Sequence, residues 1–347
     1  MPLTAEDIAI TRDYQGVVDE LTDNTSTFFT DMFFKPVITS DRDVITYDVE
    51  IGNKRLAPLS DPCVVAPLVE RNGFATYEFR PAYVMDRRKI CCRTGQLRVK
   101  GEPLGANYSI QQRRDAVMRM DGIDQIEMLD RRIEVMAAEA LITGKINVVG
   151  PQYPLRIVDF ERNSLNTFAL AGAARWNQAG VNPLKDLRTF ALANQGRKGG
   201  YFRDVIMEPS VLDVFYENAF VVARLNSFRG TDVLSITGDA RGLTDTAAFH
   251  GTIDGFRIWS YQDNYTSDAG VNTNIMPTGQ IICGSPSALM GKRYFGRIMD
   301  EEVNYEARPY AVKSWLETHP SARYGLLMSA PLPVMQRPNA VMAGTVF

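Results

Sequence analysis

The chain has 347 residues, of which 45% are hydrophobic and 23% are charged, so it has the composition of a folded protein of one or two domains. Its 38 basic and 41 acidic residues give a net charge of -3, which argues against a dedicated nucleic-acid-binding protein, because such proteins carry a basic excess or patch. Only two histidines occur, His250 and His319, which disfavours metalloenzymes and histidine-dependent hydrolases.

The N-terminus, Met1–Asp7, is polar and acidic and lacks the basic region and apolar core of a signal peptide. No stretch reaches the roughly 18 uncharged apolar residues of a membrane span, so we expect no membrane partner. Four cysteines are too few for a disulfide framework, and the C-x-x-C spacing of zinc and redox sites is absent. We expect unpaired thiols, with an interchain disulfide through Cys91 or Cys92 as the alternative.

The N-terminal part predicts a helix, an aromatic segment and a strand. Thr4 can cap a helix over residues 4–22. Four phenylalanines follow between residues 28 and 34, and so many large apolar side chains near a terminus require burial. Residues 44–51 alternate between apolar and polar side chains, which predicts a half-buried strand.

Residues 53–102 predict a long two-stranded ribbon. Prolines interrupt the region, and strand-like runs cover Phe74–Phe79 and Lys89–Val99. An isolated two-stranded ribbon is only marginally stable in water. We therefore expect the ribbon to lie on another surface, such as that of a neighbouring subunit.

Residues 109–143 predict one long helix. Ser109 and Gln112 form a capping box, apolar residues recur mostly at steps of three or four, and Gly144 ends the pattern. A helix of this length spans roughly 50 Å, and its narrow apolar stripe indicates one buried side. A hairpin is expected directly after it, with strands at 145–149 and 153–160.

From residue 183 the pattern becomes α/β. The predicted helices begin at Pro183 and Ser210. The predicted strands and extended segments cover 203–207, 254–262, 280–283, 287–290, 324–330 and 331–335. Gly196–Gly200 is glycine-rich and basic, but it follows a helix and precedes a strand, the reverse of a phosphate-binding loop.

The remaining polar clusters also lack the spacing of a reactive site. Asp300–Glu302 has no helical ligand spacing, and His319 has no evident Cys or Ser partner. We therefore expect no catalytic, cofactor or metal site. The basic groups 87–89 and 113–114 leave two partners open, an acidic neighbour or a polyanion.

An aromatic arm and an unsupported ribbon both need a surface to bury them, which predicts an obligate assembly with extended interfaces. The side chains that we expect at contacts between subunits are aromatic or basic. They are Phe28, Phe29, Phe33, Phe34, Phe74, Tyr77, Phe79, Arg87, Arg88, Lys89, Arg113 and Arg114.

Three groups of motifs carry a family resemblance. The C-terminal group is Lys313-Ser314-Trp315, Pro320, Ala322-Arg323, Ser329–Leu332 and Pro338, the second is Leu141–Lys145 with Val158–Phe160, and the third is Glu78–Val84. In their order and spacing they resemble, from end to end of the chain, the phage lambda-type major capsid proteins (the E family), which have the HK97 fold. One departure is that Ala173-Ala174-Arg175 precedes Trp176, where the family has a glycine pair.

The resemblance implies an α+β, HK97-like capsid fold with five segments. An N-arm and first strand would occupy 1–52, the extended E-loop ribbon 53–102, and the spine helix and hairpin of the peripheral (P) domain 103–165. An α/β axial (A) domain would occupy 166–299. The C-terminal segment 300–347 would return through both the P and A domains.

The implied function is that of a major capsid protein of a tailed bacteriophage, which self-assembles into hexamers and pentamers of an icosahedral shell around double-stranded DNA. The expected location is the virion capsid, assembled in the host bacterial cytoplasm. Besides itself, the expected partners are a decoration or cement protein, a separate scaffolding protein, a portal and DNA contacted non-specifically. No isopeptide crosslink through Lys89 or Lys100 is expected.

Two alternatives remain open at this point. The first is a nanocompartment (encapsulin-like) shell protein of the same fold, loaded with an enzyme cargo. The second is a soluble α/β enzyme that uses residues 183–300.

Overall fold

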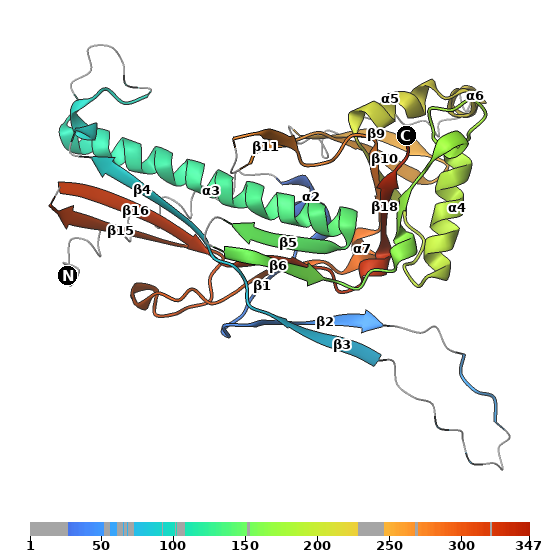
Figure 1. Cartoon of the computed structure of the whole chain (residues 1–347), viewed down its shortest axis with the longest axis horizontal. Helices are drawn as coiled ribbons and strands as arrows, with labels where there is room; N and C mark the ends of the chain where they lie inside the picture. Colours follow the sequence, from blue (N-terminus) through green and yellow to red (C-terminus); the bar gives the residue numbers. More distant parts are fainter. Residues whose placement is uncertain are drawn as a thin grey trace.

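The protein is described by a computed structural model. The described residues are 27–51, 56–60, 65, 68, 73–91, 93–100, 102, 108–150, 153–227, 246–267, 270–319 and 321–347. The helix predicted at 4–22 lies outside these residues. The molecule is elongated, with one long helix along its axis, a mixed sheet at one end and a thin strand pair projecting from the body (Figure 1).

The long helix is α3, which covers Ile110–Thr143, as predicted. The Ser109 hydroxyl accepts from the Gln112 N–H, the Gln112 side chain accepts from the Ser109 N–H, and Gly144 ends the helix in the left-handed conformation. The predicted single apolar stripe was wrong for the first half, where Ile110 and Met120 are exposed. Among the described residues, one sheet and the short helix η2 (Thr94–Gln96) lie against that half, whereas strands and helix α2 (Phe28–Phe33) cover the second half.

The sheet against the first half of α3 is antiparallel, in the order β15 (Ala311–Thr318), β16 (Ser321–Ser329) and β4 (Val84–Cys91). Its inner side chains pack on the helix, with Ile90 and Leu327 both buried there. We predicted that residues 89–99 pair with 74–79 in the ribbon, and this was wrong. Strand β4 pairs with β16 because that pairing buries its alternate residues against α3.

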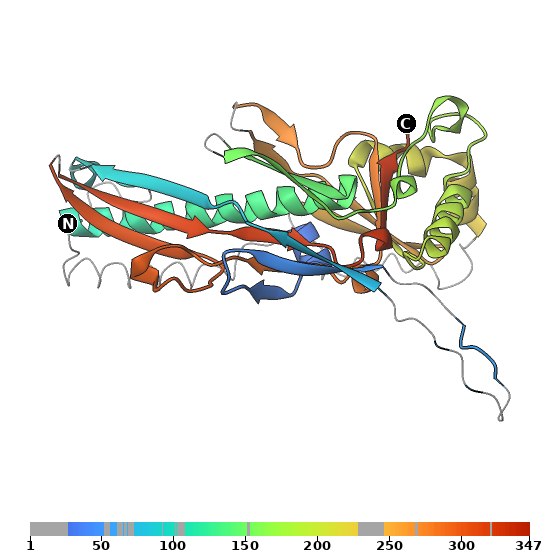
Figure 2. The same ribbon diagram turned by 60° about the horizontal axis from the view of Figure 1, so that its bottom comes forward.

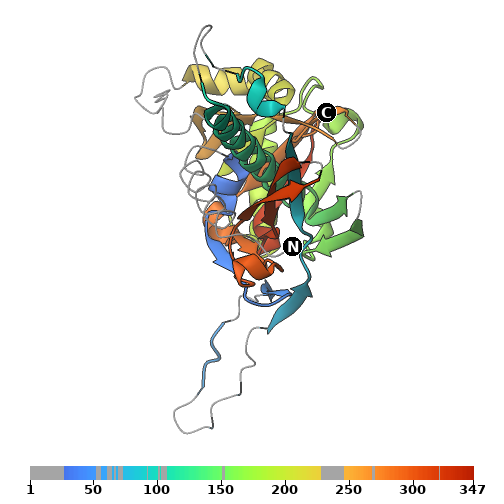
Figure 3. The same ribbon diagram turned by 90° about the vertical axis from the view of Figure 1, so that its left-hand side faces the viewer.

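The ribbon is instead formed by β2 (Ile45–Ile51) and β3 (Gly73–Phe79), which pair antiparallel. Figures 2 and 3 show this pair leaving the body obliquely, with residues 56–60 beyond the end of β2. The expected E-loop range of 53–102 therefore contains parts of two different structures, namely one strand of the projecting ribbon (β3) and one strand of the body (β4).

At the other end of the molecule lies a mixed six-stranded sheet, which confirms the predicted α/β block. Its order is β7 (Thr167–Ala169), β18 (Val341–Thr345), β13 (Gln280–Gly284), β8 (Asp204–Met207), β10 (Phe256–Tyr261) and β9 (Ala247–Ile253). Helices α4 (Pro183–Gly196), α5 (Pro209–Glu217) and α6 (Ala219–Ser227) pack beside it (Figure 1).

Between the two ends, a second mixed sheet carries the N-terminal segment. Its order is β1 (Val37–Thr39), β14 (Lys292–Phe295) and β17 (Pro331–Val334). Residues 287–290, predicted as a strand, belong to the short helix α7 (Pro286–Leu289), because Pro286 suits the first helical position and the Leu289 N–H bonds to the Ser285 carbonyl.

The smaller elements complete the chain. The predicted hairpin is formed by β5 (Lys145–Gly150) and β6 (Tyr153–Asp159), and β11 (Asn264–Thr266) pairs with β12 (Asn272–Asn274). The short 3-10 helices are η2 (Thr94–Gln96), η3 (Ser164–Asn166), η4 (Gly172–Ala174), η6 (Glu301–Val303) and η7 (Pro338–Ala340).

Candidate assembly surfaces

The ribbon has one face toward the body and one toward solvent. On the inner face the Tyr47 ring stacks on Tyr77 at 5.8 Å and contacts Phe160 at 5.9 Å. On the outer face Asp48 and Glu78 are exposed, and the Thr76 hydroxyl donates to Asp48 at 2.7 Å. Two-residue alternation thus gives the ribbon an aromatic side that is anchored and an acidic side that is uncovered.

Aliphatic side chains beyond the paired strands have no cover at all. Leu56, Leu59, Val65 and Leu68 are 95%, 101%, 91% and 102% exposed. Burying one such side chain stabilises a protein by about 1.5–3 kcal/mol. Because these four side chains are in water, they do not contribute this free energy to the stability of the monomer. Such a surface is typical of an interaction site.

The three aromatic side chains of β3 that we expected at subunit contacts differ in their exposure to solvent. Phe74, on the outer face, is 65% exposed and available to a neighbour. Tyr77 and Phe79 are partly buried and pack against the main core of their own chain. The structure therefore separates one candidate that offers surface from two that mainly anchor the ribbon.

The four phenylalanines of the N-terminal segment are buried within their own chain. Phe28, Phe29, Phe33 and Phe34 are at most 6% exposed. The Phe29 ring lies 4.4 Å from that of Tyr261, and Phe28 contacts Trp259 at 5.6 Å, so strand β10 supplies the cover. Our expectation that these side chains need another subunit is corrected, because the fold brings β10 to them.

A buried carboxylate holds this segment on the long helix. Glu134 of α3 is 3% exposed and accepts the N–H groups of Phe29 at 2.6 Å and Thr30 at 3.0 Å, together with the Thr30 hydroxyl at 2.6 Å. It thereby caps α2 across more than one hundred residues. Burial raises the pKa of Glu134 to about 7, although the three hydrogen bonds favour the charged form. Sequence reasoning missed this residue.

The basic candidates separate into paired and exposed residues. Arg88 points to the helix side, where it pairs with Asp86 at 3.0 Å and Asp124 at 2.5 Å. Arg113 pairs with the buried Glu102 at 2.7 Å, which holds the pKa of that carboxyl below its usual range. The guanidinium groups of both arginines are thus engaged within the chain.

Arg87 and Lys89 point to the opposite side of β4 and are exposed, whereas the Arg114 Nε is buried without a partner among the described residues. A polyanion site would need several basic side chains together. Within the group 87–89, only the side chains of Arg87 and Lys89 are exposed on this face of β4.

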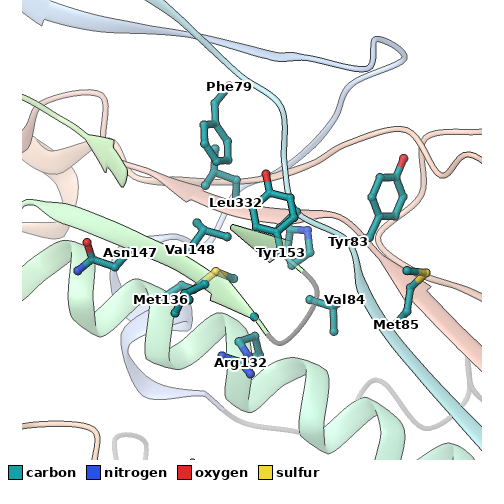
Figure 4. A pocket seen from close by; sticks show the side chains of 14 residues that line it. Phe79, Tyr83, Val84, Met85, Arg132, Met136, Asn147, Val148, Tyr153 and Leu332 are labelled. Atoms are coloured by element: carbon teal, nitrogen blue, oxygen red, sulfur yellow. The ribbon is translucent and has the colours of Figure 1, made fainter. Parts of the chain in front are cut away.

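A small cavity of about 230 Å³ lies where the ribbon meets the body (Figure 4). Phe79, Met136 of α3 and the hairpin residues Val148 and Tyr153 line it, with Arg132 at its edge. Pockets for small ligands usually enclose about 300–1,000 Å³ with convergent polar groups. This one is smaller and mainly apolar, so we interpret it as a packing gap at the ribbon's base.

Reactive groups do not converge in the part of the chain that the structure describes. No group of three or more His, Cys, Asp or Glu side chains could hold a metal there. The His250 Nε2 lies 2.8 Å from the Ser260 hydroxyl on the next strand, a contact that sequence reasoning missed. No described carboxylate bonds to this imidazole, so the described residues do not form a catalytic triad around it. His319 is exposed on the loop after β15.

Cys91 is exposed at the end of β4 and Cys283 is buried. Burial raises the pKa of the Cys283 thiol, which makes it unreactive. Cys92 lies outside the described residues. None of the described helices has the length and apolar character that crossing a membrane requires.

Comparison with known proteins gives a consistent family. The family model described as "Phage major capsid protein E" matches residues 15–346. The chain is 23% identical to the major capsid protein of Escherichia phage lambda over 297 residues, 83% of this chain and 84% of that protein. It is also 23% identical to that of Enterobacteria phage P21 over 320 residues, 90% of this chain and 91% of the relative.

Among solved structures, the crystal structure of a prophage capsid protein from Escherichia coli CFT073 superposes with a TM-score of 0.75 at 19% identity. The match covers 97% of this chain and 99% of that chain. The likeness therefore extends over the ribbon, the long helix and the mixed sheet together.

Proposed function

Because the chain belongs to the family of phage major capsid protein E, we propose that its copies form the hexamers and pentamers of an icosahedral shell around double-stranded DNA. The chain is a major capsid protein of a tailed phage, and its α+β fold is HK97-like. The family match and the phage relatives favour this function over the encapsulin-like alternative.

The observation that carries the proposal is the exposed ribbon. Its tip, beyond the paired strands that leave the body (Figure 2), holds four aliphatic side chains that are each at least 91% exposed. No described part of the chain covers them, so we propose that another copy does. A shell in which every ribbon lies on a neighbouring subunit buries all of these tips at once.

We assign the segments on the same basis. The N-arm and the first strand of the ribbon, β2, comprise residues 1–52, although the described phenylalanines of the arm pack inside the subunit. We narrow the E-loop to β3 and the residues between β2 and β3, since β4 belongs with α3 in the P domain. Residues 103–165 complete that domain, the six-stranded sheet is the core of the A domain at 166–299, and 300–347 returns through both.

The proposed partners follow from the shell. They are other copies of this chain, a decoration or cement protein, a separate scaffolding protein, a portal and the packaged DNA. Contact with DNA is proposed to be non-specific, because the net charge of -3 does not favour tight binding of a polyanion. The location is the virion capsid, with assembly proposed in the host cytoplasm. We propose that the chain has a structural role and no enzymatic one.

Electron microscopy of the purified protein tests the shell, with a ribbon-shortened variant as the comparison. In this variant residues 52–72 are replaced by Asn-Gly, so that Ile51 and Gly73 flank a two-residue hairpin turn. A deletion of 60–95 would be unsuitable, because it removes β4 from its sheet. We expect shells or capsomers from the natural chain and a folded, soluble subunit without shells from the variant.

Two outcomes contradict the proposal. The first is a natural chain that stays monomeric at high concentration and turns over a small-molecule substrate. The second is normal shells from the ribbon-shortened variant, which would show that the ribbon is not part of the interface.

A further inference from the structure

The sheet of β15, β16 and β4 has an outer face that is only half covered. In the register of the three strands, Met328 and Leu326 of this face pack under Ile298 and Val303 of the loop around η6. The following row consists of Lys89, Tyr324 and Trp315, one from each strand, and it lies outside the apolar cluster around η6.

This row forms an aromatic platform with two cations above it. The rings of Trp315 and Tyr324 lie 5.5 Å apart at an interplanar angle of 20°. The Arg87 guanidinium is 5.3 Å and the Lys89 ammonium 5.9 Å from the centre of the Tyr324 ring. The ring therefore positions both cations on the same side of the sheet.

The charges of Arg87 and Lys89 are not neutralised within the described chain. Neither has a carboxylate at ion-pair distance there. Other cations nearby do have partners, since Lys313 pairs with Asp300 at 3.3 Å and Glu302 at 2.8 Å. On the same face of this sheet, the carboxylate nearest to Lys89 in the strand register is that of Glu317. It lies on β15, two strands away from β4. Among the described residues, the platform thus carries two exposed positive charges without a carboxylate partner.

The ribbon carries the complementary pair. Asp48 lies opposite Thr76, and Glu78 stands two residues farther along β3, so the two carboxylates are diagonal neighbours about 7–8 Å apart. Arg87 and Lys89 are two residues apart on one strand, a separation of about 7 Å. Neither carboxylate has a basic partner among the described residues. Charge and spacing therefore match.

The two pairs cannot meet within one chain. Strands β3 and β4 follow one another along nearly the same line, so Glu78 and Arg87 are separated by up to about 30 Å of extended backbone held in two sheets (Figure 1). A contact between them must join two copies, and because different surfaces meet, it can repeat from copy to copy around a ring.

We propose that Arg87 and Lys89 of one copy bind Asp48 and Glu78 on the ribbon of a second copy, with the exposed Phe74 lying toward the platform of Tyr324 and Trp315. This inference rests on the proposed shell function and names the surface of the neighbour that receives the ribbon. Because the pairs lie near solvent, the contact is expected to weaken at high salt.

Charge reversal with rescue tests the contact. The variant R87E/K89E and the variant D48K/E78K should each give at least tenfold fewer shells than the natural chain, with unchanged thermal unfolding of the unassembled subunit. The four changes combined in one chain should restore the shells. The charge-conserving controls R87K/K89R and D48E/E78D should assemble normally.

The possible results distinguish a failure of the shell function from a failure of the proposed contact. If the natural chain forms no shells, the shell function fails. If it forms shells and so do both reversed variants, or if the fourfold variant is not rescued, the contact is overturned while the shell function stands.

Chemical crosslinking of the natural chain tests the contact even if a charge-reversed variant misfolds. Shells of the natural chain, assembled from a mixture of ¹⁵N-labelled and unlabelled copies, are treated with a carbodiimide, which joins an amine and a carboxylate in contact. Mass spectrometry should find Lys89 linked to Asp48 or Glu78 of a different copy. Linkage of Lys89 only to other carboxylates would overturn the proposal.

Discussion

The six-stranded sheet and the ribbon of β2 and β3 differ in how their apolar side chains are buried. Every described residue of β8 and of β13 is buried, and three helices lie beside the sheet. The ribbon has one covered face near its base and none at its tip, where Leu59 is 101% exposed. The sheet completes its core within one chain, whereas the ribbon has to complete its core with another.

This difference assigns stability and assembly to different residues. Changes in the body should lower the free energy of unfolding of the isolated subunit. Changes in the outer ribbon should leave that quantity unchanged and affect only the yield of shells. A residue that breaks this rule would place the boundary between body and ribbon elsewhere.

The largest effect on the body is expected at the N-terminal aromatic cluster. Phe29 is 0% exposed, so Phe29→Ala should lower the free energy of unfolding by about 3–5 kcal/mol, because it leaves a cavity beside Tyr261. The matched control is Phe74→Ala on the ribbon, with an expected change within about 0.5 kcal/mol. Urea unfolding of unassembled subunits measures both. Equal effects would contradict the separation.

The second effect concerns Glu134 and pH. Its pKa in the folded chain is about 7, above the ordinary value of 4.5, so the folded state binds this proton more tightly than the unfolded state. The stabilisation is fully present below about pH 4.5 and is lost as the pH rises toward 7, by about 3 kcal/mol at most. Glu134→Gln should remove this pH-dependent part of the free energy of unfolding.

The measurement for Glu134 is the unfolding free energy of both proteins between pH 4.5 and 8. The natural chain should lose stability relative to the Gln variant across that window. Parallel curves would show that the buried carboxyl does not titrate with folding.

A smaller effect is expected where α3 ends. Gly144 has a φ of +76°, and an added Cβ would lie 2.9 Å from the Cβ of Arg162. Gly144→Ala should therefore cost about 1–2 kcal/mol. Gly172 also has a positive φ, of +57°, but open space around it, so Gly172→Ala separates backbone strain from the clash. If thermal unfolding shifts equally for the two variants, the Arg162 contact is unimportant.

The smallest effect on the subunit is expected at the ribbon tip. Leu59→Ser with Leu68→Ser should change the unfolding free energy by less than about 0.5 kcal/mol, because both side chains are already in water. Shell yield should nevertheless fall strongly. Particle counts by electron microscopy, made beside thermal unfolding, check both statements, and normal yield would contradict the role of the tip.

Sequence patterns predicted the regular elements well where local signals agree. The capping box, the periodicity and the final glycine defined α3 to within one residue. The hairpin and the strands β8, β10 and β13 were also found. The run 287–290 was misassigned, because a short apolar run fits a strand or a helix equally well.

Long-range partners could not be predicted in the same way. Strand β4 pairs with β16 more than two hundred residues later, and no local pattern specifies that choice. The cover of Phe29 by Tyr261 and its hydrogen bond to Glu134 likewise depend on distant segments.

The separation of Arg88 from Arg87 and Lys89 was within reach of the sequence. Alternation along β4 puts Arg88 on the same face as Ile90, which packs against α3, and its two neighbours on the other face. The missing element was the assignment of residues 84–91 to a strand of the body.

The most direct test of the account compares the solvent access of the ribbon tip in the free subunit and in the shell. The thiol of a Leu59→Cys variant is reacted with a maleimide, and the labelled peptide is followed by mass spectrometry. We predict fast reaction in the unassembled subunit and a rate at least tenfold lower in shells. Equal rates in the two states would show that no neighbour covers the ribbon, and they would contradict the central claim.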